Sequence, residues 1–284
     1  MATTTLTIGG DLDVYRFGFG AMRITGDGIW GEPPDEGAAR DLLRRVVQTD
    51  VNLIDTADSY GPEVSERLIA EALYPYPDNV VIATKGGLER PGPNRWTANA
   101  RPEHLKRCCE GSLRRLKLER IDLYQLHRVD PNVPIEDSVG ALAELQEDGK
   151  IRHIGLSNVN AEQLERAQQI VPIVSVQNRY NVADRESEDV LQACEDSGLA
   201  FFPWAPLGSR GSNNLAQAGG LLDDAARAHG ASPGQVALAW LLHRSPVMLP
   251  IPGTGSVAHL EENMAAAGLD LDQAELDAIS TAVA

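Results

Sequence analysis

Short apolar, β-branched runs alternate with longer amphipathic runs along most of the chain, and this alternation constrains the fold more than any other feature. The short runs are typical of buried strands, and the longer runs are typical of helices that cover a sheet. We predict strands near residues 17–20, 53–55, 80–84, 121–126, 151–156, 173–177, 200–204 and 247–251. We predict helices over residues 102–118, 135–147, 161–169, 186–197, 221–243 and 257–267. About eight βα repeats favour a closed (β/α)8 TIM barrel of the α/β class over an open sheet.

The N-terminal residues show a different pattern. Within residues 5–16, alternating side chains flank Gly9 and Gly10, which predicts a β-hairpin. We expect this hairpin to cover the bottom of the barrel, and the alternative is a frayed N-terminus. Pattern reasoning indicates no linker elsewhere, so residues 1–284 are predicted to form a single domain.

Two segments rich in Gly, Pro and polar residues, 89–100 and 207–219, each follow a predicted strand. Long connections after barrel strands lie on the catalytic face, where they shape pockets. We therefore predict that both are active-site loops. For the second segment, the alternative is a disordered insertion.

Composition excludes several classes of function. The chain has 25 Lys and Arg against 41 Asp and Glu, and this net charge of −16 repels nucleic acids and anionic membranes. The three cysteines, Cys108, Cys109 and Cys194, are placed unsuitably for a disulfide framework or a metal site, so we expect neither. No signal peptide or membrane-spanning run is visible, and we expect a cytoplasmic protein.

Ionisable residues stand at the ends of three predicted strands: Asp55, Lys85 and His127. The carboxyl ends of parallel barrel strands converge on one mouth, so these side chains are predicted to lie together. Tyr60 follows Asp55 after a short loop on the same face. Each residue alone has an ordinary structural explanation, such as a cap, a solvated charge or simple packing.

Together, the four residues suit the reduction of a carbonyl group. Hydride addition to a carbonyl creates alkoxide charge, and a positioned acid must then supply a proton. Tyr60 can supply it if the ammonium of Lys85 lowers the tyrosine pKa, with Asp55 holding the lysine charged. His127 would then donate a hydrogen bond to the carbonyl oxygen.

Several motifs in this order resemble the aldo-keto reductases and cover almost the whole chain. They are the segments 55–61 (DTADSYG), 122–127 (DLYQLH), 154–158 (IGLSN), 177–181 (QNRYN) and 251–254 (IPGT), with Lys85 after a strand-like run. The resemblance implies that Asp55, Tyr60, Lys85 and His127 are the catalytic set, with Tyr60 as general acid.

The resemblance also implies a nicotinamide site. Ser157, Asn158 and Gln177 match residues that hold the nicotinamide carboxamide, and Trp204 matches an aromatic residue that stacks on the ring. For Ser157 and Asn158 a helix N-cap is a further interpretation, which is compatible with the first.

The phosphates and adenosine are expected at the loops after the last two strands, a common phosphate site in barrels. The residues predicted to bind them are Leu207, Gly208, Ser209, Arg210, Gly253, Thr254, His259 and Asn263. Many family members have lysine and arginine where this chain has Gly253 and His259. We still expect NADPH rather than NADH, because Thr254, His259 and Asn263 can hold the extra phosphate.

The expected substrate is a small carbonyl compound. Met22, Trp30 and Trp96 are predicted to line its pocket, Tyr180 less so, and ordinary packing under loops is the alternative. The sequence resembles a bacterial branch that includes pyridoxal reductases, which makes pyridoxal a candidate. No feature of the sequence indicates an oligomeric state.

The sequence thus predicts an NADPH-dependent oxidoreductase that reduces an aldehyde or ketone to an alcohol. One alternative is a nucleotide-sensing binding protein similar to the family's channel-associated β subunits, with weak turnover. Another is a barrel lyase that uses Lys85 as a Schiff base.

Overall fold

The computed structural model describes residues 4–208 and 219–281. Its main sheet is parallel, and its strands follow the order β11-β10-β9-β8-β5-β4-β3. These strands are β3 (Phe19–Gly20), β4 (Leu53–Asp55), β5 (Val81–Gly86), β8 (Ile121–Leu126), β9 (Ile151–Ser157), β10 (Ile173–Arg179) and β11 (Ala200–Trp204). All of them lie where the apolar runs predicted strands.

Residues 247–252 close the sheet into a barrel. On one side, the N–H of Phe201 donates to the carbonyl of Val247 at 2.9 Å. On the other side, the N–H of Gly18 donates to the carbonyl of Pro250 at 2.9 Å. The segment forms an isolated bridge instead of the predicted regular strand, because Pro250 and Pro252 lack the N–H groups that a ladder needs.

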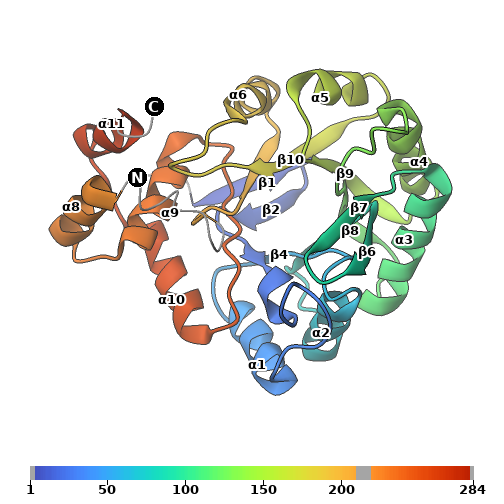
Figure 1. The fold of residues 1–284 in the computed structure, drawn as a ribbon, viewed down its shortest axis with the longest axis horizontal. Helices are drawn as coiled ribbons and strands as arrows, with labels where there is room; N and C mark the ends of the chain where they lie inside the picture. The colour runs from blue at the N-terminus through green and yellow to red at the C-terminus, as the bar shows by residue number, and fades with distance from the viewer. Residues whose placement is uncertain (1–3, 209–218, 282–284) are drawn as a thin grey trace.

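Helices surround the strands (Figure 1). They are α1 (Glu36–Val46), α2 (Val64–Leu73), α3 (Pro102–Leu116), α4 (Ile135–Glu147), α5 (Ala161–Gln168), α6 (Glu188–Ser197), α8 (Gly219–His229), α9 (Pro233–Arg244), α10 (Val257–Ala265) and α11 (Gln273–Thr281), with short 3-10 turns η1 (Ala21–Ile24) and η2 (Ala266–Gly268). Their buried positions face the sheet, as amphipathic runs predict.

The prediction of one helix over residues 221–243 is wrong. Two helices, α8 and α9, replace it, because Gly230 has a φ of +62° that a helix cannot continue through. Ser232 then caps α9 by accepting a hydrogen bond from the N–H of Gln235, with Pro233 in the first turn.

The predicted N-terminal hairpin is present as β1 (Thr5–Ile8) and β2 (Leu12–Tyr15). Ile8, Leu12 and Val14 are buried against the interior side chains of the barrel. The hairpin therefore fills the end of the barrel opposite the strand carboxyl ends, as expected.

A second hairpin lies at the other end of the barrel. The segment predicted as an active-site loop, 89–100, folds as β6 (Leu88–Gly92) and β7 (Arg95–Ala98). In Figure 1 this hairpin lies toward the viewer, and the paler β1–β2 hairpin lies away from the viewer. Of the other predicted loop, only residues 207–208 and 219 fall within the described residues.

Candidate active site

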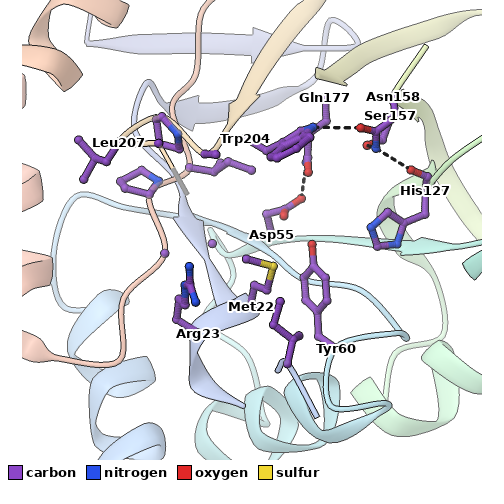
Figure 2. A pocket seen from close by; sticks show the side chains of 18 of the residues that line it. Met22, Arg23, Asp55, Tyr60, His127, Ser157, Asn158, Gln177, Trp204 and Leu207 are labelled. Carbon is purple, nitrogen blue, oxygen red and sulfur yellow. Dashed lines mark hydrogen bonds between the residues drawn. The ribbon is translucent and has the colours of Figure 1, made fainter. Parts of the chain in front are cut away.

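A cavity of about 330 Å³ opens at the carboxyl ends of the strands. Asp55 ends β4, Lys85 lies near the end of β5 and His127 follows β8, so the predicted convergence is present. Asp55, Tyr60 and His127 line the cavity (Figure 2), and the fully buried Lys85 is not part of its lining. The lining residues are Gly20, Met22, Arg23, Ile29, Asp55, Tyr60, Trp96, His127, Arg128, Ser157, Asn158, Gln177, Trp204, Ala205, Pro206, Leu207, Gly208, Ile251, Pro252 and Gly253.

Lys85 and Asp55 form a buried ion pair. The Nζ of Lys85 donates to Oδ2 of Asp55 at 2.7 Å and to the carbonyl of Thr56 at 2.8 Å. Burial opposes the lysine charge, but Asp55 and Tyr60 outweigh it and raise the pKa of Lys85 above its ordinary value. The lysine is therefore a fixed ammonium ion beneath the cavity.

The second carboxylate oxygen of Asp55 is held by two amides. Gln177 donates to Oδ1 at 2.8 Å and Gln125 donates to the same atom at 3.2 Å. Gln125 was not singled out in the sequence, although it lies two residues before His127 on β8, and alternate residues of a strand share a face. Asp55 is thus held from three sides.

Tyr60 lies between the ion pair and two aromatic rings. Its ring centroid is 5.3 Å from the Nζ of Lys85, and it meets the rings of His127 and Trp96 edge to face at 5.8 Å and 6.3 Å. Burial raises the pKa of Tyr60, and the nearby Lys85 offsets only part of that rise. The prediction that Lys85 lowers this pKa has the right direction, but burial of the hydroxyl outweighs the effect of the lysine.

His127 is neutral at physiological pH. Burial lowers its pKa well below the ordinary value, and the cations Lys85, Arg128 and Arg90 act in the same direction. Its Nδ1 lies 3.2 Å from the hydroxyl oxygen of Ser59. A neutral imidazole keeps one N–H, so His127 can still donate a hydrogen bond.

The predicted carboxamide residues lie together on one wall. Asn158 has a left-handed φ of +57°, and its amide donates to the carbonyl of His127 at 3.0 Å. Its Oδ1 accepts from the indole N–H of Trp204 at 3.2 Å (Figure 2). The N-cap of α5 is Asn160 rather than Ser157 or Asn158, so the capping interpretation of those two residues is wrong.

The predicted phosphate residues divide into three groups. Leu207, Gly208 and Gly253 line the cavity, and Ser209 and Arg210 lie outside the described residues. Outside the lining are buried Thr254 and Asn263 and exposed His259.

Gly253 is required by the backbone. A Cβ there would lie 2.8 Å from the carbonyl oxygen of Gly20, and 3.4 Å from Cγ of Arg23. The backbone therefore favours glycine at the position where many family members have a cation.

Of the predicted substrate residues, Met22 and Trp96 line the cavity. Trp30 does not line the cavity, and the neighbouring Ile29 takes that place. The side chain of Trp30 is 37% exposed. Tyr180 is fully buried, stacks on Trp240 and donates its hydroxyl to Glu188 at 2.6 Å. The placement of both residues in the pocket was therefore wrong.

Three arginines at the mouth were missed in the sequence. Arg23 and Arg128 line the cavity. Arg90 stacks on Trp96, with its Cζ 3.6 Å from a ring centroid of that tryptophan. Arg128 directly follows His127 in the chain, and that adjacency was an available signal.

Arg90 connects two loops to its own β6–β7 hairpin beside Trp96. Its guanidinium donates to the carbonyls of Gly28, Ile29, Ser59 and Arg95 at 2.7–3.0 Å. The aromatic wall next to Tyr60 is therefore supported by a fixed, planar cation.

Within residues 4–208 and 219–281, no group of three or more metal-binding side chains comes together. No helix in the same part of the chain combines the length and hydropathy needed to cross a membrane.

Comparison with known proteins agrees with this geometry. The chain is 52% identical over 262 residues to an uncharacterized oxidoreductase of Schizosaccharomyces pombe, covering 92% of this chain and 84% of that one. It is 44% identical over 289 residues to pyridoxine 4-dehydrogenase of Escherichia coli, covering 99% of each chain.

Solved structures share the fold along nearly the full length. The glycerol dehydrogenase of Gluconobacter oxydans superposes with a TM-score of 0.89 at 27% identity, covering 100% of this chain and 96% of that one. An aldo-keto reductase of Klebsiella pneumoniae, solved in complex with NADPH, gives 0.80 at 27% identity, covering 98% and 94%. A model of the aldo/keto reductase family matches residues 16–284, and this chain therefore belongs to that family of oxidoreductases.

Proposed function

We propose that this protein reduces an aldehyde or ketone to an alcohol with NADPH, using Tyr60 as proton donor. One observation carries the proposal: the hydroxyl-bearing Tyr60, the neutral His127 and the buried Lys85–Asp55 pair meet at one cavity. That combination supplies an acid, a carbonyl-orienting donor and a fixed positive charge within one small volume.

The cavity walls suit a nicotinamide dinucleotide. Ser157, Asn158 and Gln177 offer amide and hydroxyl groups for the carboxamide, and Trp204 offers a flat face for the ring. On the opposite side, Gly208 and Gly253 allow a close backbone approach for the phosphates. The bound cofactor supplies the hydride.

Proton transfer is the task of the chain itself. Burial keeps Tyr60 protonated at neutral pH, so its hydroxyl is available to donate to the alkoxide oxygen that hydride addition creates. The Lys85 ammonium stabilises the phenolate left behind, and Asp55 keeps that lysine charged and in place. His127 orients the carbonyl oxygen with its single N–H.

This geometry disfavours the Schiff-base alternative. A lysine must be neutral to attack a carbonyl, but the Lys85 side chain is fully buried, paired with Asp55 and has a raised pKa. Lys85 is also absent from the cavity lining. Treatment with borohydride and a substrate aldehyde is expected to leave Lys85 unmodified, and an adduct at Lys85 would overturn the proposal.

NADPH is proposed over NADH because Arg23 lies beside Gly253, on the side proposed for the phosphates. Its Cγ lies 3.4 Å from where a Cβ of Gly253 would be, so it occupies the space beside that glycine. A guanidinium binds phosphate oxygens through paired N–H groups. The NADPH-bound relative is consistent with this preference.

The cofactor proposal is tested by binding. NADPH and NADH are titrated separately, following tryptophan fluorescence, in wild type and in Arg23→Gln. We expect tighter NADPH binding in wild type, and about tenfold weaker NADPH binding in the variant. Equal dissociation constants for the two cofactors would refute the NADPH preference.

The reaction is tested by NADPH oxidation with nitrobenzaldehyde, methylglyoxal and pyridoxal. Pyridoxal is the proposed biological candidate because the 44% identical relative is a pyridoxine 4-dehydrogenase. Wild type is expected to oxidise NADPH with at least one of these aldehydes, and Tyr60→Phe serves as the control. Rates no higher than this control on every aldehyde would contradict the proposed function.

A further inference from the structure

Arg128 is a charged group at the mouth of the cavity that the proposed reaction does not use. It is exposed and lines the cavity next to His127. Within residues 4–208 and 219–281, no side chain forms a hydrogen bond or an ion pair with it. It contrasts in this respect with Arg90, whose guanidinium is held by several backbone carbonyls.

The charges around Arg128 give the cavity a positive character. Among the charged groups of the lining, the carboxylate of Asp55 is neutralised by Lys85, whereas no side chain in the described residues neutralises the charge of Arg128. This local excess of positive charge occurs in a chain whose net charge is −16. An anionic ligand is therefore attracted to the cavity although the protein as a whole is acidic.

Arg128 directly follows His127, which lies on the side of the cavity away from the proposed phosphate loops. Its neighbour His127 is joined to Asn158 by the 3.0 Å hydrogen bond to the backbone carbonyl. Figure 2 shows Leu207 and Arg23 on one side, and His127 with Asn158 on the opposite side. The cofactor phosphates are proposed near the first pair, so the substrate is expected on the side of His127 and Arg128.

We propose that Arg128 binds an anionic group, a carboxylate or a phosphate monoester, on the carbonyl substrate, which makes it a specificity-determining residue. This inference rests on the proposed function. The carbonyl oxygen meets Tyr60 and His127, the apolar body of the substrate packs against Trp96, and the anionic group extends to the guanidinium. Arginine suits both anions because its planar N–H groups match two oxygens at once.

Matched pairs of substrates test the proposal. The 2-, 3- and 4-carboxybenzaldehydes are each compared with their methyl esters, and pyridoxal 5′-phosphate is compared with pyridoxal. Each pair differs mainly in the anion, so the ratio of kcat/KM within a pair reports its recognition. The benzoate isomers show where a carboxylate is accepted, and the pyridoxal pair reports on a phosphate.

The variants are Arg128→Gln, Arg128→Lys and, as a control, Arg107→Gln. Arg107 is an exposed arginine of α3 outside the cavity lining, so its loss changes net charge without touching the site. In wild type at least one anionic substrate is expected to be preferred by about tenfold. Arg128→Gln should abolish that preference mainly through KM, Arg128→Lys should restore part of it, and Arg107→Gln should keep it.

A binding measurement keeps the inference separate from the reaction. Calorimetric titration of 4-(hydroxymethyl)benzoate and its methyl ester needs no turnover, and the acid is expected to bind more tightly in wild type than in Arg128→Gln. No anionic preference in any pair, or one that persists in Arg128→Gln, would overturn the role of Arg128. Loss of turnover on every aldehyde would instead count against the proposed function, and the calorimetric comparison would then decide for or against Arg128.

Discussion

The two ends of the barrel use the same strands for opposite purposes. At the base, Ile8, Leu12 and Val14 of the β1–β2 hairpin pack on apolar interior residues, and none is more than 4% exposed. At the mouth, Asp55 and Lys85 are equally buried but form an ion pair. Base and mouth therefore differ in chemistry and not in burial.

A single strand shows how short the transition is. Side chains two residues apart share a face, so Val81, Ala83 and Lys85 of β5 point to the same interior. In β8 and just beyond it, the same change runs from apolar Leu123 through polar Gln125 to ionisable His127. The interior thus changes from apolar to ionisable within two positions in β5 and four in β8, which separates the part that stabilises the barrel from the part proposed to perform the reaction.

The largest effect is expected from breaking the buried pair at the mouth. Lys85→Met leaves the carboxylate of Asp55 buried without its counter-ion. We expect the unfolding free energy to fall by about 3–5 kcal/mol and the reductase activity to be lost. The double variant Asp55→Asn/Lys85→Met removes both charges and should recover much of the stability while staying inactive. Urea unfolding and NADPH oxidation measure the two effects.

Two results would contradict this interpretation of the pair. One is an unchanged unfolding midpoint in Lys85→Met, which would mean that the charge is not buried in solution. The other is a double variant that regains activity, which would remove the lysine and the aspartate from the proposed proton-transfer arrangement.

At the base, stability and activity should separate in the opposite direction. Ile8 is 1% exposed, so Ile8→Ala should lower the unfolding free energy by about 2–4 kcal/mol through lost burial and a cavity. Activity per folded molecule should stay within about twofold, because the base is remote from the mouth. Thr5→Ala, an exposed position on the same strand, is the control and should change stability by less than about 0.5 kcal/mol.

Asp58 is a buried carboxyl group whose ionisation should lower the stability of the folded protein. This buried carboxyl group has an oxygen, Oδ1, without a hydrogen-bond partner among the described residues. Burial raises its pKa to about 7, and the nearby Glu66 adds to the rise. In the unfolded chain the pKa is near its ordinary value of about 4.

The folded protein therefore holds a proton on Asp58 between about pH 4 and 7 that the unfolded chain releases. Stability from this group falls as the pH rises through that window, and the destabilisation is complete above about pH 7. The difference between the two pKa values corresponds to at most about 4 kcal/mol at pH 8. Asp58→Asn also loses the hydrogen bonds of the carboxylate, so we expect it to stabilise the protein by about 2 kcal/mol at pH 8 and to change little at pH 4. Thermal unfolding across this range measures it, and an equal shift at both pH values would exclude a buried ionisation.

The smallest expected effect concerns Arg90 beneath the aromatic wall. Arg90→Gln removes the cation that stacks on Trp96, so we expect about fivefold lower kcat/KM with little change in Tm. Arg90→Lys should not rescue activity, because an ammonium lacks the planar donor set that reaches four carbonyls. Arg95→Gln, an exposed change on the same hairpin, should match wild type. Rescue by lysine would show that only the charge matters.

The sequence predicted residues at strand ends better than residues in loops. Asp55, Lys85 and His127 were placed together because strand ends in a parallel barrel have one destination. The single-domain organisation remains a prediction. Loop residues follow no such periodicity, so Trp30 and Tyr180 were misplaced, and Arg23 and Arg128 were overlooked.

Two other differences also have physical causes outside local patterns. The high pKa of Tyr60 depends on how completely neighbouring loops bury it, which three-dimensional packing decides. The role of Gly253 depends on the carbonyl of Gly20, more than two hundred residues earlier in the chain. The local sequence around Tyr60 and around Gly253 does not reveal either contact.

The closing segment 247–252 has a consequence for the motions of the barrel. Pro250 and Pro252 cannot donate, so this segment is joined to β3 and β11 by fewer hydrogen bonds than a regular strand would make. It forms a seam, and fluctuations that open the barrel should begin there. The seam also leads into Gly253 on the proposed phosphate side, so a bound dinucleotide would stabilise this segment against opening. Amide hydrogen exchange at Phe201 and Leu249 should slow when cofactor is added, more than exchange at the interior strands β8 and β9.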